Sequence, residues 1–142
     1  MKSLETLQRV QRVTLAIYGA IAGALSLLTV LLPNWVAHLV TGRAVANAAI
    51  LYSQREAGAR LGLAMVALIA AWMPRPPRAL VWAMFAALAA GVIGPILSKL
   101  AIALPLADLQ PFNKLLVFDG AVALVLLVTQ ELRAAIVRKA RA

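Results

Sequence analysis

The sequence predicts an all-α integral membrane protein, a four-helix bundle with both termini in the cytoplasm. Of its 142 residues, 63% are hydrophobic and only 13% are charged. Soluble domains are closer to half apolar and carry about twice this charged fraction. The apolar residues form four long runs, so we expect a single transmembrane domain over residues 1–142. Its spans are predicted at about residues 13–32, 53–73, 79–98 and 112–130.

The first span, residues 13–32, is an uncharged run that ends at Pro33. It is longer than the apolar core of a signal peptide, and no small-residue cleavage site follows it. We therefore expect a retained transmembrane helix, preceded by a short amphipathic lead over residues 1–12. Gly19 and Gly23 form a GxxxG pattern in this span, and such a pattern lets a neighbouring helix approach closely.

The second span, residues 53–73, is too short to cross a bilayer without carrying ions into it. Only 14 residues separate Arg60 from Arg75, whereas a spanning helix needs about 20. Arg60 and Glu56 are therefore predicted to lie within the membrane. Gly58 and Gly62, on another face of the same helix, form a second GxxxG pattern and are predicted to serve in helix packing.

The last two spans differ in charge. The third, residues 79–98, contains no charged residue. The fourth, residues 112–130, is also too short to cross a bilayer without a charged residue. Only 16 residues separate Lys114 from Glu131, and the acidic Asp119 is among them. We therefore expect a carboxylate inside the membrane in this helix.

The distribution of Lys and Arg predicts the orientation of the chain. Nine of the 14 basic residues lie in the N-terminal segment, the Pro-rich turn at residues 74–78 and the C-terminal tail. The other five lie in or near two longer connections, residues 33–51 and 99–111. Because basic residues favour the cytoplasmic side, both termini are predicted to face the cytoplasm of a bacterial inner membrane, in a multi-pass topology.

Arg60 and Asp119 are predicted to form an ion pair between the second and fourth spans. At about 1.5 Å per residue, they lie roughly 18 and 17 Å from the cytoplasmic ends of their helices. Charges inside a membrane usually face the bundle interior and pair, and Arg binds a carboxylate with two donors. Glu56 lies one turn outward from Arg60. A polar network at the outer rim is predicted to add Gln54, Arg55, Lys99, Asn113 and Lys114.

Three roles stay open for this cluster. As a structural device, the Arg60–Asp119 pair fixes how the helices register against one another. As a ligand site in an outward-facing pocket, the cluster binds the polar end of a quinone, a bound lipid or another lipophile. As part of a small proton-coupled transporter, Asp119 or Glu56 carries a proton.

Several functions are disfavoured by the composition. The chain has no cysteine, which excludes disulfides and thiolate chemistry. His38 is the only histidine and is predicted to be an interfacial residue rather than a metal or haem ligand. Catalytic motifs are absent, so we expect no catalytic residue and no enzyme activity. The basic residues form no stripe with interleaved aromatics, which argues against nucleic-acid binding.

The run Gln54-Arg55-Glu56-x-Gly58-x-Arg60-x-Gly62, together with four short spans and a charged fourth helix, resembles the DoxX-like group of small bacterial membrane proteins. The resemblance implies a small helical bundle, and some members of that group act as membrane subunits of quinone-linked oxidoreductases. The GxxxG faces and the absence of a soluble domain favour an accessory or interaction subunit of a larger membrane complex. Its expected partners are the lipid bilayer and other membrane subunits or further copies of the chain.

Overall fold

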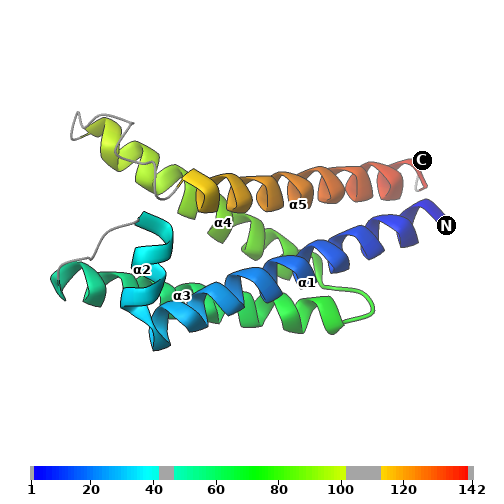
Figure 1. Ribbon diagram of the computed structural model, residues 1–142. Coiled ribbons are helices and arrows are strands. Elements are labelled where there is room, and N and C mark those ends of the chain that lie inside the picture. The colour runs from blue at the N-terminus through cyan, green and yellow to red at the C-terminus, as the bar shows by residue number, and fades with distance from the viewer. Residues whose placement is uncertain (1, 42–46, 102–112, 141–142) are drawn as a thin grey trace. The chain divides into compact units, whose positions relative to one another are not determined.

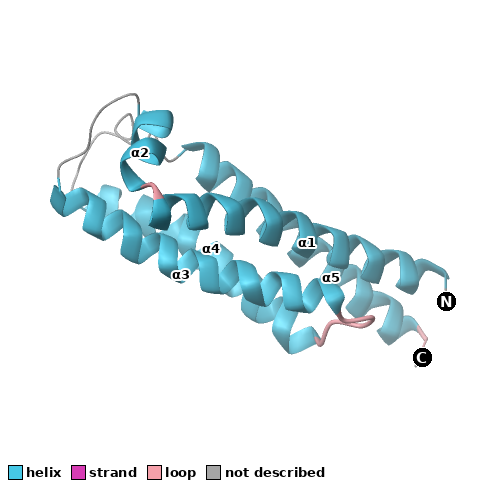
Figure 2. Ribbon diagram, turned by 60° about the horizontal axis from the view of Figure 1, so that its bottom comes forward, coloured by secondary structure: helices cyan, strands magenta, loops and turns pink. Residues whose placement is uncertain are grey.

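The computed structural model describes residues 2–41, 47–101 and 113–140, and every regular element in these ranges is a helix (Figures 1 and 2). The prediction of an all-α protein is therefore confirmed. Five helices are present in these ranges rather than the four predicted, because the start of the first connection is itself helical. They are α1 (Lys2–Leu31), α2 (Pro33–Thr41), α3 (Asn47–Trp72), α4 (Arg78–Ala101) and α5 (Asn113–Lys139).

The chain divides into two compact units. Unit 1 comprises Met1–Leu15 and Ala70–Ala142, and unit 2 comprises Ala16–Ile69. Unit 1 therefore holds the first turns of α1, the end of α3, and all of α4 and α5. Unit 2 holds the rest of α1, α2 and most of α3.

The helix α1 merges the predicted lead and the first span into one element. Nothing around residues 12 and 13 breaks a helix, so the lead does not form a separate segment. The helix ends before Pro33, which has no N–H and whose ring clashes with the carbonyl four residues earlier. Pro33 then becomes the first residue of α2, where its fixed φ suits a helix start.

The faces of α1 are clearly divided by burial. Its buried residues recur every three or four positions, as one side of an α-helix does. They are Gln8, Gln11, Leu15, Tyr18, Gly19, Ala22 and Ser26. The opposite side exposes large apolar side chains, Val13, Ile17, Ile21 and Leu28 among them. The buried side of α1 therefore mixes polar with apolar side chains, while large apolar side chains lie on the exposed side.

Unit 2 is held together by α1 packing against α3. Gly19 lies so close to α3 that a Cβ placed on it would be 2.6 Å from Leu68 Cγ and 2.9 Å from the Ala64 carbonyl oxygen. One turn later, a Cβ on Gly23 would be 3.6 Å from Ala64 Cβ. Residues further along α1 thus meet residues earlier in α3, so the two helices run antiparallel.

Unit 1 is built on α4 packed along α5. Val81, Met84 and Leu88 recur at helical spacing on the buried side of α4. The buried apolar residues of α5 are Val122, Ala123 and Leu126. These residues form an apolar layer in which side chains from α4 and α5 exclude solvent.

The Pro-rich turn between α3 and α4 is confirmed as a tight connection. The helix α3 ends at Trp72, two residues before Pro74. Pro76 is fully buried, and the Pro77 carbonyl accepts hydrogen bonds from the Leu80 and Val81 amides at 3.1 and 3.2 Å. The Pro77 carbonyl therefore accepts the first i to i−4 hydrogen bond of α4, from Val81, and also satisfies the Leu80 amide, which otherwise lacks a partner at the helix start.

Two of the helices in the described residues are long and apolar enough to cross a membrane. They are α1 over Ser3–Leu31 and α5 over Val117–Lys139, and 28% of the most apolar stretch of each is buried. A core helix of a soluble protein would be mostly buried, so this exposure suits lipid contact. The described apolar stretch of α4, Arg78–Gly94, is shorter. Membrane crossing by any of these helices stays a prediction.

Candidate functional site

Arg60 and Glu56 form an ion pair on one side of α3. Arg60 Nη2 lies 3.9 Å from Glu56 Oε1, and the spacing is one helical turn. The Glu56 side chain is 50% exposed and that of Arg60 is 22% exposed. At this distance and exposure, such a pair adds only a few tenths of a kcal/mol to helix stability. The i, i+4 arrangement expected from the sequence is therefore present within the helix.

Gln54 ties α3 to the end of α1. Its Nε2 donates a hydrogen bond of 3.3 Å to the Val30 carbonyl oxygen. The last carbonyls of a helix have no partner within the helix, so this contact satisfies one of them. Gln54 was predicted as part of a polar network, and its described role is to cap α1.

Asp119 is 4% exposed on the side of α5 that also buries Val122, Ala123 and Leu126. It belongs to unit 1, whereas Arg60 belongs to unit 2. The ion pair predicted between them therefore stays a prediction. The side chains of Arg55, Lys99, Asn113 and Lys114 lie outside the described part of the chain, and their place in the network stays a prediction as well.

The two GxxxG patterns occupy different environments. Gly19 and Gly23 form the contact face between α1 and α3. A Cβ on Gly58 or Gly62 would meet no described atom within 4 Å, so the packing role predicted for them has no described partner. His38, the only histidine, is exposed on α2.

Gly58 and Gly62 belong to a stripe of exposed residues on α3, which we call the α3 stripe. Its other members are Met65 and Ile69, both 57% exposed. The spacing of four, three and four residues places all four on one side of the helix. Because the two glycines lack side chains, another helix can approach the backbone of α3 closely at this point.

A second polar region lies in unit 1 and was not predicted from the sequence. The fully buried Gln11 donates a 3.1 Å hydrogen bond from Nε2 to Thr129 Oγ1. Thr129 Oγ1 also donates to a carbonyl of the preceding turn of α5, and Val125 O lies 2.8 Å away. Gln11 Oε1 is shielded from solvent and has no hydrogen-bond partner among the described residues. This contact joins the first turns of α1 to α5.

Two further contacts in unit 1 involve arginines near helix ends. Arg12 Nε donates a 2.9 Å hydrogen bond to the Ala71 carbonyl, which lies in the last turn of α3. A cation at this position also suits the negative end of the helix dipole. Gln130 Nε2 approaches the Arg78 carbonyl at 3.5 Å and so places α5 beside the start of α4.

Arg133 follows Gln130 by three residues and therefore lies on the same side of α5. Its Nη1 is shielded from solvent and has no hydrogen-bond partner among the described residues. Two effects lower the pKa of Arg133: partial burial of its guanidinium, and the positive charge of Arg78 nearby. Arg133 lies beyond the predicted span 112–130. We call Arg78, Gln130 and Arg133 the arginine site.

The sequence contained a signal for this region that the prediction missed. Thr129, Gln130 and Arg133 follow Leu126 at helical spacing, which continues the buried side of α5 with polar residues.

Comparison of the chain with protein families, with curated proteins and with solved structures finds no match. The resemblance to the DoxX-like group is therefore supported by no relative and stays a prediction.

Proposed function

We propose that this chain is a non-catalytic, multi-pass membrane protein that serves as an interaction subunit of a larger assembly. The bilayer contacts the apolar sides of α1 and α5, and the α3 stripe packs against a transmembrane helix of another subunit. A bacterial inner membrane is the setting that the distribution of basic residues favours.

The single observation that carries this proposal is the composition of the α3 stripe. Exposed large apolar side chains suit lipid as well as protein, so Met65 and Ile69 alone do not favour a partner. Two exposed glycines one turn apart contribute no apolar contact with lipid and cost helix stability. Close approach of a second helix offsets that cost by van der Waals packing along the exposed backbone.

The α3 stripe binds a helix from a different membrane subunit rather than a soluble protein. On the C-terminal side of the glycines the stripe continues with the exposed apolar side chains of Met65 and Ile69, which suit the interior of a bilayer. A homodimer through the same stripe is the competing arrangement, and the stoichiometry of the complex distinguishes the two.

The test is native mass spectrometry of the full chain after gentle extraction from its own membrane. We expect a retained protein partner, and the double variant Gly58→Ile, Gly62→Ile is expected to lose it. The control is Gly91→Ile, Gly94→Ile, because these glycines also have no described atom within 4 Å of an added Cβ but lie on α4.

Each result decides between functions. Loss of the partner in the α3 variant alone supports the proposal. Release of a second copy of the chain rather than a different protein makes the stripe a homodimer interface. A lone chain that retains a small apolar molecule removes the subunit proposal and favours the lipophile-binding alternative.

A further inference from the structure

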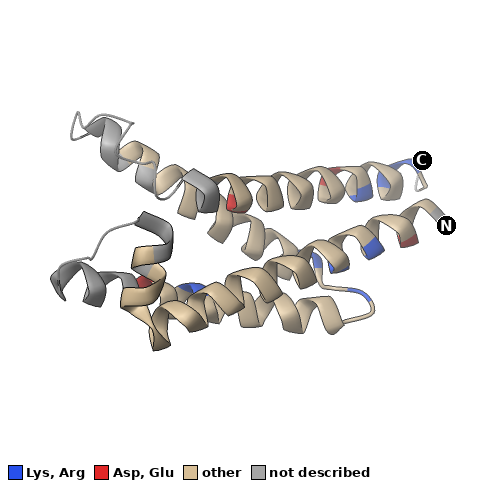
Figure 3. Ribbon diagram, in the orientation of Figure 1, with Lys and Arg blue, Asp and Glu red and all other residues tan. Residues whose placement is uncertain are grey.

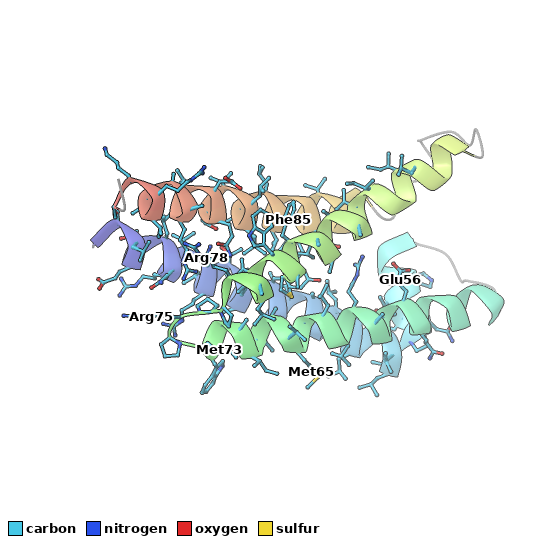
Figure 4. All side chains as sticks on the ribbon, turned by 180° about the vertical axis from the view of Figure 1, so that it is seen from behind. Glu56, Met65, Met73, Arg75, Arg78 and Phe85 are labelled. Atoms are coloured by element: carbon cyan, nitrogen blue, oxygen red, sulfur yellow. The ribbon has the colours of Figure 1, made fainter. Side chains whose placement is uncertain are left out.

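The arginine site holds two positive charges near one another and a buried donor group without an acceptor. Arg133 lies on α5. Arg78, which is labelled in Figure 4, is the first residue of α4. Gln130 contacts the Arg78 backbone and fixes the two helices at this point. Like charges brought together with partial burial are unfavourable unless an anion neutralises them.

The protein itself supplies no such anion among the described residues. Arg78 and Arg133 form no ion pair there, and Glu131, the carboxylate nearest in sequence, is exposed on another side of α5. Lys and Arg of unit 1 gather in the first turns of α1, the turn before α4 and the last turns of α5 (Figure 3). The local field is therefore positive and attracts anions.

We propose that Arg133 and Arg78 bind a phosphate group, with the solvent-accessible N–H groups of the two guanidinium groups donating to its oxygens. A guanidinium offers a planar fork that matches two phosphate oxygens, and the bond is charge-assisted. A phosphate carries one or two negative charges and accepts several hydrogen bonds, so one group satisfies both arginines.

Two kinds of molecule carry a phosphate group that fits this site. The headgroup of an anionic phospholipid lies at the cytoplasmic surface of the membrane, where the predicted topology places this end of unit 1. Free phosphate in the cytoplasm offers the same oxygens. The lipid source predicts that binding requires an anionic acyl lipid, and the free source predicts binding of inorganic phosphate alone.

The experiment measures lipid and phosphate binding to the full chain by native mass spectrometry from detergent micelles. Phosphatidylglycerol and the zwitterionic phosphatidylcholine are titrated separately, followed by inorganic phosphate without lipid. We expect phosphatidylglycerol to bind, and Arg133→Gln and Arg78→Gln each to weaken it about tenfold, as loss of a charge-assisted hydrogen bond implies.

The controls separate a specific site from overall charge. Arg138→Gln removes an exposed charge five residues further along α5 and is expected to change the affinity less than twofold. Arg133→Lys keeps the charge but lacks the fork, so its affinity is expected to fall between those of the wild type and Arg133→Gln. Circular dichroism checks that each variant keeps its helix content. Because Arg78 is exposed, its variant tests the site even if Arg133→Gln does not fold.

The possible results are distinct. Selective loss of phosphatidylglycerol binding in Arg133→Gln and Arg78→Gln supports the lipid source. Binding of inorganic phosphate with the same dependence on Arg78 and Arg133 supports the free source. Equal weakening of lipid binding in Arg138→Gln and Arg133→Gln overturns the proposal, because binding then follows net charge. The absence of binding in every titration overturns it as well.

Discussion

At Gly19 the structure leaves no room for a side chain. The Ala64 carbonyl oxygen, a backbone atom that has little room to move, lies 2.9 Å from the position of an added Cβ. Leu68 Cγ is closer but belongs to a flexible side chain. Only glycine therefore allows α1 and α3 to approach this closely.

Gly19→Ala is expected to destabilise the protein by about 1–2 kcal/mol. Overpacking costs about 1–3 kcal/mol, and the better helix propensity of Ala recovers up to about 1 kcal/mol. The free energy of unfolding, from SDS titration in micelles followed by circular dichroism, measures the change. Gly23→Ala is the control, since its Cβ meets Ala64 at an ordinary 3.6 Å and no loss is expected. Equal effects of the two substitutions would show that α1 and α3 do not pack as described.

Buried polar side chains mark the limit of residue-level prediction. Gln11 is fully buried and bonded to Thr129, 118 residues away. The sequence near Gln11 shows only a polar residue in an amphipathic segment. Its burial becomes clear once the partner on α5 is known, because a buried amide requires a hydrogen-bond partner that no local pattern identifies.

At the scale of elements, two helix C-termini are completed by side chains from other helices. Gln54 binds the Val30 carbonyl at the end of α1, and Arg12 binds the Ala71 carbonyl at the end of α3. Prolines shortly after both ends stop each helix, and they leave carbonyls without intrahelical partners. The prolines are visible in the sequence, whereas the capping side chains are not.

Arg12→Met is expected to loosen the last turn of α3 and to lower the free energy of unfolding by about 1–2 kcal/mol. The variant keeps side-chain length but loses the donor to Ala71 and the cation near the helix end. Hydrogen exchange of the peptide covering residues 68–77 measures the local change. Arg9→Met removes an exposed charge one turn earlier and is expected to leave this exchange rate unchanged. Similar acceleration in both variants would assign the effect to charge alone.

At the scale of the whole molecule, the chain crosses the membrane either four times or twice. The sides of the membrane on which two positions lie distinguish the two topologies. With four crossings, Asn34 at the start of α2 and Arg75 in the Pro-rich turn lie on opposite sides of the membrane. If only α1 and α5 cross, both positions lie on one side, since the chain between those helices does not traverse the bilayer. Asn34 and Arg75 are both exposed, and the chain has no cysteine to interfere with labelling.

We expect Asn34→Cys to react with a membrane-impermeant maleimide in intact spheroplasts, and Arg75→Cys to react only after permeabilisation. Positive residues in the Pro-rich turn keep it in the cytoplasm, while the first connection faces outward. Labelling of permeabilised cells controls for reactivity at each position. Reaction of both variants in intact spheroplasts, or of neither, would remove the four-crossing topology.

The sequence by itself determined the helical class, the ends of α1 and α3, and the tight turn before α4. These features depend on residues close together in the chain: apolar runs, helical spacing and the prolines that end them. It also indicated Gly19 and Gly23 as a packing face and placed Glu56 one turn from Arg60. Only the tertiary structure decided that Gly19 and Gly23 meet α3 while Gly58 and Gly62 stay exposed. It alone brought Gln130 of α5 against the Arg78 carbonyl at the start of α4, across 52 residues of chain. The physical reason is that helix formation follows from local hydrogen bonding and periodicity, whereas the choice of contacting faces depends on how all the side chains fit together.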